Sequence, residues 1–222
     1  MIAKPSARPI QRSGLLRPLQ DVDMWLQQNK IINLSRAVPC LDGLVLQPGK
    51  ILSYWYLIGA PSRRKGYVLG MILRNGIVQT GIGGGLCQLS NLIYWITPHT
   101  PLTVRERWRH GYDVFPDAGR TQPFGSGATC AYNHIDLQIE NRTEHSFQLR
   151  LWMDKNDLHG EWRSTVPAQA TYRIREDQPP HHQRMVGRPY APQHHRPRCL
   201  YPGIRPLCPP GIPDRKPRRY DV

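Results

Sequence analysis

Apolar residues recur at helical spacing in one central stretch of the chain. Leu86, Leu89 and Ile93 are separated by three or four residues, which places them on one face of a helix. The stretch follows directly on the glycines 83–85, and glycine permits positive φ angles and close approach of another segment. The pattern therefore predicts a glycine loop and then a buried helix that ends near Pro98.

The remaining apolar pattern predicts one more helix and a set of short strands. The helix is expected from Asp21, with Asp21 or Asp23 as its cap, and should end before Pro39. Asn75-Gly76 between two apolar runs is a strong hairpin signal, and the polar turn 141–145 predicts a second hairpin between the strands beside it. Strands are expected at 44–46, 51–58, 67–73, 77–80, 102–108, 135–139 and 147–151, with shorter ones at 158–162 and 172–174. Two helices and about eight strands indicate an α+β fold with a mainly antiparallel sheet.

The composition divides the 222 residues into three parts. Residues 1–20 carry prolines among basic residues and are expected to be a basic, irregular leader. Residues 21–176 hold the apolar periodicity of one domain. Residues 177–222 are rich in Pro, Arg and His and lose that periodicity, which predicts a disordered tail.

The net charge of +14 lies mainly in the leader and the tail, so we expect no specific nucleic-acid partner. No apolar run is long enough to span a membrane, and the N-terminus lacks the apolar core of a signal peptide. The chain is therefore expected in the cytoplasm. The five cysteines are odd in number, widely scattered and contain no C-x-x-C pair, which argues against a disulfide framework or a structural zinc site: Cys40, Cys87, Cys130, Cys199 and Cys208. We expect no metal and no cofactor.

Cys87 is the first candidate for chemistry. It falls in the first turn of the predicted helix, where free N–H groups and the helix dipole lower the pKa of a thiol. The alternative is structural: the glycines allow tight packing and Cys87 is a small, buried, apolar residue.

Several motifs along the chain resemble the VanW family over roughly residues 15–176. The most specific is Gly-Gly-Gly-Leu-Cys-Gln-Leu-Ser at 83–90. The others are 21–27, Asn29-Lys30, Asn33-Leu34, Pro48-Gly49, Gly66-Tyr67, Asn91, His110, 113–117, 123–129 and 135–137. The family is named after an accessory gene of some vancomycin-resistance clusters, so the resemblance implies a link to vancomycin resistance or cell-wall metabolism. The chain departs from the family at Gly127, where many members have Asp, and after residue 176, where a shifted reading frame or an unrelated tail would explain the composition.

One functional hypothesis is a cysteine-dependent hydrolase or acyltransferase that acts on a wall-related amide. Papain-like and transglutaminase-like hydrolases have a Cys at a helix N-terminus, followed by a His and an Asp or Asn. The same order here gives Cys87, His110 and Asp136, with His134 able to replace either partner. Gln88 or the amides of the glycine loop would line an oxyanion hole.

The competing hypothesis is a non-catalytic module that binds a cell-wall precursor, a peptide or another anionic ligand. A glycine loop at a helix N-terminus suits an anion. Arg105, Arg107 and Arg109 alternate along a predicted strand and are expected on one face of it. The candidate ligand-binding residues are Gly83, Gly84, Gly85, Gln88, Ser90, Asn91, Arg107, Arg109, Tyr112, Asp113 and Asp117. A hydrolase additionally requires Cys87 and His110 within hydrogen-bonding reach.

Overall fold

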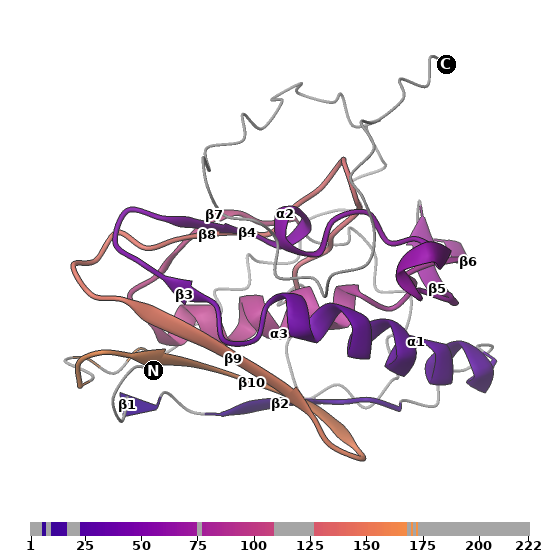
Figure 1. Cartoon of the computed structure of the whole chain (residues 1–222), viewed down its shortest axis with the longest axis horizontal. Coiled ribbons are helices and arrows are strands. Elements are labelled where there is room, and N and C mark those ends of the chain that lie inside the picture. The colour runs from indigo at the N-terminus through magenta and orange to yellow at the C-terminus, as the bar shows by residue number, and fades with distance from the viewer. Residues whose placement is uncertain are drawn as a thin grey trace, which may run out of the picture.

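A computed structural model of the chain describes residues 6–7, 10–16, 23–74, 77–108, 127–167, 170 and 172. Two longer helices, α1 (Met24–Ala37) and α3 (Cys87–Ile96), combine with antiparallel strands (Figure 1), which confirms the α+β class. A short helix, α2, covers Tyr54–Ile58. Single 3₁₀ turns are η1 (Val38–Cys40), η2 (Arg63–Lys65) and η3 (Thr97–His99). No helix in the described ranges is long and apolar enough to cross a membrane.

The strands form three sheets, in all of which the paired strands are antiparallel. The five-stranded sheet contains β1 (Ser6–Ala7), β2 (Gln11–Gly14), β3 (Val45–Leu46), β9 (Phe147–Met153) and β10 (Asp157–Ser164). The three-stranded sheet contains β4 (Ile51–Ser53), β7 (Thr103–Glu106) and β8 (Gln138–Glu140). The hairpin of β5 (Leu69–Arg74) and β6 (Ile77–Ile82) forms the third sheet.

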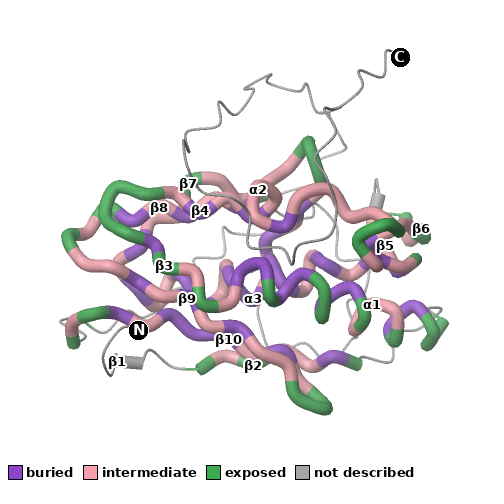
Figure 2. Tube along the Cα trace, viewed as in Figure 1, coloured by how far each residue is buried: buried purple, intermediate pink, exposed green. Residues whose placement is uncertain are grey.

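Helix α3 lies between the two larger sheets (Figure 1). Thr97, directly after the helix, accepts a hydrogen bond from the indole N–H of the buried Trp162 on β10. On the other side, the phenol of Tyr54 on α2 donates to the carbonyl of Leu86 at 2.9 Å. Figure 2 shows buried residues along α3 and along strands of both sheets. The helix predicted from the apolar pattern is therefore packed between the two larger sheets.

The predicted helix limits and the first hairpin are confirmed. Helix α1 begins one residue after Asp23 and ends two residues before Pro39. Asp23 makes no side-chain cap bond and instead accepts from the indole of Trp25 at 3.1 Å. Strands β5 and β6 pair over their whole length, with the Asn75-Gly76 tip outside the described residues.

The expected strand at 51–58 is wrong in its second half. Strand β4 ends at Ser53 and helix α2 follows directly. The hydroxyl of Ser53 accepts from the amide of Tyr56, and the carboxylate of Asp136 accepts from the amide of Trp55. These two caps satisfy the first amides of the helix and outweigh the strand preference of the aromatic residues.

The predicted second hairpin is also wrong. Strand β8 pairs with β4 and β7, whereas β9 pairs with β10 and β3, so residues 141–146 cross from one sheet to the other. The buried Asn141 fixes this crossing, because its side-chain amide donates to the carbonyls of Leu46 and His145. The hairpin in this part of the chain is the one between β9 and β10.

Part of the expected irregular leader belongs to the five-stranded sheet. Both β1 and β2 pair with β10, and Leu15 is buried in the core with 1% of its surface exposed. The sequence signal was weak because β2, Gln-Arg-Ser-Gly, has no apolar alternation of its own. The predicted tail 177–222 lies outside the described residues.

Candidate functional site

The segment 127–130 packs against one face of α3. Ser90 and Asn91 lie three and four residues after Cys87, so all three project from the same side. The hydroxyl of Ser90 is 2.7 Å from the carbonyl of Ala128, and the side-chain oxygen of Asn91 accepts from the amide of Ala128 at 2.6 Å. The motif that begins with the glycine loop thus meets a segment about forty residues further along the chain.

Cys87 is half-buried, and its sulfur lies 3.9 Å from the sulfur of Cys130. The thiol of Cys130 donates toward the sulfur of Cys87, and this contact lowers the pKa of Cys87 to about 7, despite burial. The Cys87 thiol donates to the carbonyl of Cys130 at 3.6 Å. Backbone hydrogen bonds of Cys130 and of Cys87 itself lower the pKa of Cys87 further. The pKa of Cys87 is therefore lowered, as expected, but the main cause is the hydrogen bond from Cys130 rather than the helix N-terminus.

Cys130 is the residue that sequence reasoning missed. It is 8% exposed, and the hydroxyl of Ser90 lies 3.3 Å from its sulfur. Its hydrogen bond to Cys87 and its burial raise the pKa of the Cys130 thiol. The sequence holds no signal of this contact, because the two cysteines are 43 positions apart and approach only through the packing of segment 127–130 on α3.

The glycine loop is shaped by close packing. A Cβ on Gly84 would lie 2.1 Å from the carbonyl carbon of Gly70, and one on Gly85 would lie 2.3 Å from the side chain of Lys30. The amides of Gly83 and Gly84 donate to the carbonyls of Val68 and Gly81. Because these two amides are already bonded, they cannot serve as oxyanion donors in this arrangement.

Gln88 points away from the sulfur pair toward the N-terminal strand. Its side-chain amide nitrogen lies 2.7 Å from the carbonyl of Gly14 and 2.9 Å from the hydroxyl of Ser13. Its side-chain oxygen is buried and has no hydrogen-bond partner among the described residues. Gln88 therefore anchors β2 to α3 rather than lining an oxyanion hole.

Both carboxylate oxygens of Asp136 accept hydrogen bonds at the start of α2. One accepts from the hydroxyl of Ser53 at 2.5 Å, and the other accepts from the amides of Trp55 and Leu137. Burial raises the pKa of Asp136, and the nearby Glu106 adds to this, although the hydrogen bonds oppose it. These contacts leave Asp136 poorly placed to orient a catalytic imidazole.

Of the three arginines expected on one strand face, only Arg105 lies on β7, Arg107 follows the strand, and Arg109 lies outside the described residues. A register shift between Val104 and Glu106 interrupts the alternation of side chains. Arg105 is exposed, whereas Arg107 is half-buried, donates to the carbonyl of Gly127 and packs 4.3 Å from the ring centroid of Tyr94 on α3. Arg107 thus helps to hold segment 127–130.

The expected base and several expected ligand residues fall on a part of the chain that the structure does not describe. They are His110, Arg109, Tyr112, Asp113 and Asp117. His134, the expected substitute, is exposed in the tight turn that follows Cys130, in which Asn133 has a φ of +66°.

An open groove of about 380 Å³ lies between α1, η2 and β5. Trp25, Asn29 and Arg63 line it with polar or aromatic groups, and Tyr67 and Val68 are among its other walls. The groove therefore offers an aromatic surface and a cation on the side of the molecule that carries the β5–β6 hairpin.

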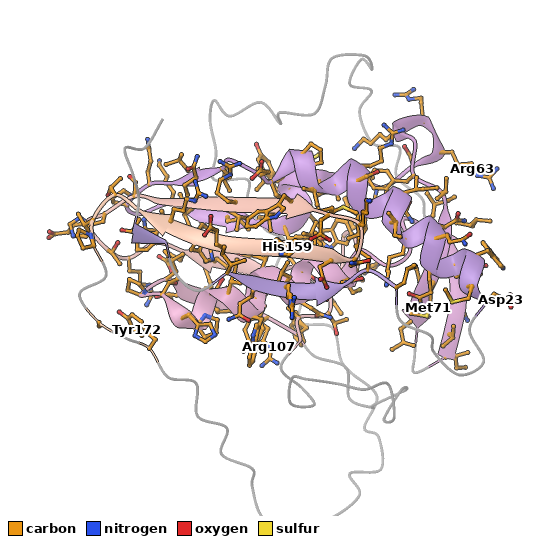
Figure 3. All side chains as sticks on the ribbon, turned by 90° about the horizontal axis from the view of Figure 1, so that it is seen from below. Asp23, Arg63, Met71, Arg107, His159 and Tyr172 are labelled. Atoms are coloured by element: carbon orange, nitrogen blue, oxygen red, sulfur yellow. The ribbon has the colours of Figure 1, made fainter. Side chains whose placement is uncertain are left out.

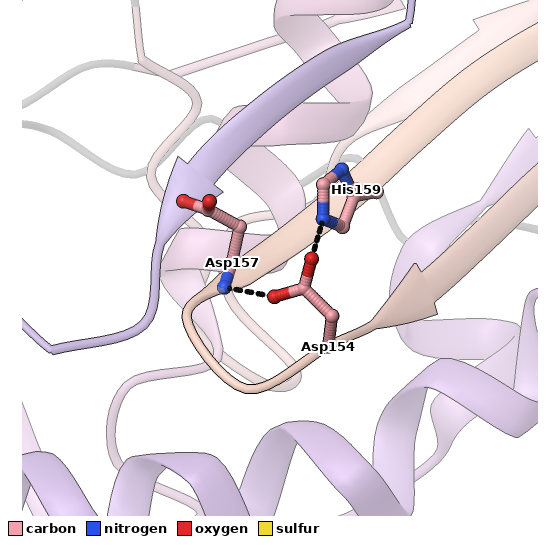
Figure 4. A group of neighbouring side chains, drawn as sticks. All are labelled: Asp154, Asp157 and His159. Carbon is pink, nitrogen blue, oxygen red and sulfur yellow. Dashed lines mark hydrogen bonds and ion pairs between the residues drawn. The ribbon is translucent and has the colours of Figure 1, made fainter.

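Asp154, Asp157 and His159 form the one cluster of metal-ligating groups in the described part of the chain. Asp154 accepts from the amides of Asn156 and Asp157 and contacts His159 at 2.7 Å, and these bonds lower the pKa of Asp154 to about 2. Figure 4 shows the carboxylate of Asp157 turned away from the other two side chains. His159 lies on the outer face of the five-stranded sheet (Figure 3), stacked on Trp152. The three residues lie at the turn between β9 and β10, and their hydrogen bonds hold this turn together.

The chain belongs to the VanW family, because a family model described as "VanW like protein" matches residues 29–163. That range contains Cys87, Cys130 and Asp136.

Two curated relatives are similar to the chain. It is 36% identical over 152 residues to the vancomycin B-type resistance protein VanW of Enterococcus faecalis, covering 68% of this chain and 55% of that protein. It is 26% identical over 118 residues to the uncharacterized protein YoaR of Bacillus subtilis, covering 53% of this chain and 37% of that protein. The matched part of the chain thus spans about half of the first relative and about a third of the second. No solved structure matches it.

Proposed function

We propose that the chain is a cysteine-dependent hydrolase or acyltransferase that acts on a cell-wall-related amide. The observation that carries this proposal is the Cys87 thiol in the first turn of α3, which is half-buried and has a pKa lowered to about 7. A thiol of this kind is partly ionised near neutral pH and is a competent nucleophile. The name of the Enterococcus relative supports a connection with vancomycin resistance and hence with the wall.

The chemistry follows the usual path of acyl transfer to a thiolate. The base, for which His110 is proposed, takes the proton of the Cys87 thiol, and the sulfur attacks the amide carbonyl carbon. The C–N bond then breaks, and the protonated base gives the proton to the leaving amine. The resulting thioester then reacts with water in a hydrolase or with a second amine in an acyltransferase. Because Asp136 caps α2, Asp113 or Asp117 is the more suitable group to orient the imidazole.

The test uses an activated ester, which reports acyl transfer whatever the natural substrate is. Treatment with p-nitrophenyl acetate should release one equivalent of nitrophenol in a burst and leave an acetyl group on Cys87, detected by intact mass and peptide mapping. Cys87→Ala should abolish both signals, and Cys40→Ala, which removes a buried thiol away from the pair, should retain them. Muropeptides from digested peptidoglycan then serve as amide substrates, with product masses as the readout.

Acetylation spread equally over several cysteines, or a muropeptide turnover unaffected by Cys87→Ala, would contradict the proposal.

A second candidate function, a binding module for an anionic wall fragment, is favoured by the groove beside α1. Trp25 offers an aromatic face and Arg63 a cation for a carboxylate, as in many binding sites for small ligands. We expect Arg63→Ala to weaken muropeptide binding in calorimetry. Arg64→Ala is the matched control, because Arg64 lies in the same exposed turn but does not line the groove. Equal affinities of the two variants would contradict this function.

A further inference from the structure

The two sulfurs at the N-terminus of α3 belong to segments that are held together independently of the thiols. Ala128 is bonded to Asn91 and lies within reach of the Ser90 hydroxyl, and the amide of Thr129 donates to the carbonyl of Trp108. The amide of Ala131 donates to the carbonyl of Ile135. Cys130 is therefore held on both sides, and the Sγ–Sγ distance of 3.9 Å is set by the backbone framework rather than by one flexible contact.

We propose that Cys87 and Cys130 form a redox-active dithiol, which a hydroperoxide oxidises to an internal disulfide. Bond formation requires the sulfurs to approach from 3.9 Å to about 2.05 Å. Of the three cysteines in the described part of the chain, only these two contact each other; Cys40 lies 3.6 Å from the carbonyl of Arg36.

The surroundings give the two thiols different parts in the reaction. Cys87 is the less buried residue of the two and carries the lowered pKa, so it reacts first with the oxidant. Cys130 is 8% exposed, which shields it from direct attack, while its sulfur already faces Cys87. This division between an attacking thiol of lowered pKa and an adjacent resolving thiol is typical of redox-sensitive cysteine pairs.

The reaction balances in two steps. The Cys87 thiolate attacks the distal oxygen of the hydroperoxide, the O–O bond breaks, and protonation of the leaving oxygen gives an alcohol, or water from hydrogen peroxide. The sulfur of Cys130 then attacks the Cys87 sulfenic acid, and the expelled hydroxide takes the Cys130 proton to form water. Two thiols lose two electrons and two protons in total, and the peroxide is reduced by two electrons.

This inference goes beyond the proposed function and does not rest on it. The disulfide would tie the first turn of α3 to segment 127–130 and would remove the Cys87 nucleophile. Any activity that depends on the Cys87 thiolate would then be present only in the reduced protein.

The test exposes the reduced full chain to hydrogen peroxide, blocks the remaining thiols with iodoacetamide and maps the peptides without reduction. The expected result is a linkage between the peptides of Cys87 and Cys130, with the loss of two alkylatable thiols that dithiothreitol restores. Cys130→Ala should instead accumulate a Cys87 sulfenic acid that dimedone traps, and Cys40→Ala should behave as the wild type.

A disulfide from Cys87 to any other cysteine, or direct conversion of Cys87 to sulfinic acid in the wild type, would overturn the inference. Thiol counting and linkage mapping do not depend on acyl transfer. A disulfide without acetylation by the ester would therefore refute the proposed function alone, and acetylation without a disulfide would refute this inference alone.

Discussion

At the scale of single residues, the contacts around α3 separate groups that face the sulfur pair from groups that only support it. Ser90 and Asn91 hold the partner segment, whereas Gln88, one residue after Cys87, is turned to β2. A helix rotates each successive residue by about 100°, so neighbouring motif positions serve different surfaces. The motif therefore combines one thiol of lowered pKa with several packing contacts.

The ionisation of Cys87 should be visible in its alkylation by iodoacetamide. With a pKa of about 7, the rate at pH 7 is expected at roughly half of its alkaline plateau, because about half of the thiol is ionised. An ordinary thiol reaches only a few per cent of its plateau at that pH. The measurement is the rate of Cys87 carbamidomethylation between pH 5 and 10, followed by peptide mass.

Cys130→Ala removes the largest cause of the lowered Cys87 pKa, so the midpoint of this profile should move to higher pH. Cys130→Ser keeps a hydroxyl donor, so its midpoint should lie between those of Cys130→Ala and the wild type. A midpoint that stays at the same pH in Cys130→Ala would show that the helix terminus alone sets the ionisation.

The close approach of Gly84 to the backbone of Gly70 gives a second prediction at this scale. Gly84→Ala would place a Cβ 2.1 Å from a backbone carbon, so the loop or β5 must shift. We expect a loss of about 3 kcal/mol in the free energy of unfolding, at the upper end for overpacking. Gly14→Ala is the control, because its Cβ would meet nothing nearer than 3.8 Å. Urea unfolding of both variants makes the comparison, and equal midpoints would contradict the packing argument.

At the scale of elements, the strongly periodic segments could be predicted from the sequence and the short capped ones could not. Helix α3 and strands β9 and β10 have apolar positions that match their buried faces. Helix α2 could not be predicted because its caps come from Ser53 and from Asp136, about eighty residues away. The same limit applies to the candidate site: the place of Cys87 in the first turn of a helix can be predicted from the sequence, whereas the contact with Cys130 depends on tertiary packing alone.

Asp136 provides the element-scale prediction. Asp136→Ala leaves the amides of Trp55 and Leu137 without their acceptor and should cost about 1–2 kcal/mol of unfolding free energy. Asp136→Asn keeps an acceptor oxygen and should cost less.

The two variants also differ from the wild type in pH dependence. The pKa of Asp136 is raised in the folded state, so between the unfolded value of about 3.9 and the folded value the folded state binds more protons. The wild type should therefore lose stability relative to Asp136→Asn as the pH rises through this window, and the difference should then level off. Urea unfolding at pH 4–8 measures it, and a difference independent of pH would contradict the raised pKa.

At the scale of the whole molecule, α3 is the element that lies between the two larger sheets (Figure 1). The Tyr54 phenol reaches it from the side of the three-stranded sheet, and Trp162 bonds Thr97 just beyond its end from the side of the five-stranded sheet. The N-terminal strand β2 is joined to α3 by the side chain of Gln88, which donates to the carbonyl of Gly14. A disturbance of the N-terminal segment should consequently reach the site through the position of α3.

The last prediction concerns this N-terminal segment. Leu15 is 1% exposed and Leu16 is 47% exposed, so the two neighbours form a matched pair in which only the first contributes to the core. We expect Leu15→Ala to lower the free energy of unfolding by about 2–5 kcal/mol, through lost burial and the cavity left behind. Leu16→Ala should stay within about 0.5 kcal/mol of the wild type. Deletion of residues 1–16 removes β1, β2 and the acceptors of Gln88 as well, and should cost more than Leu15→Ala. Chemical unfolding followed by tryptophan fluorescence measures all three, and a deletion variant as stable as the full chain would show that the segment is dispensable for the fold.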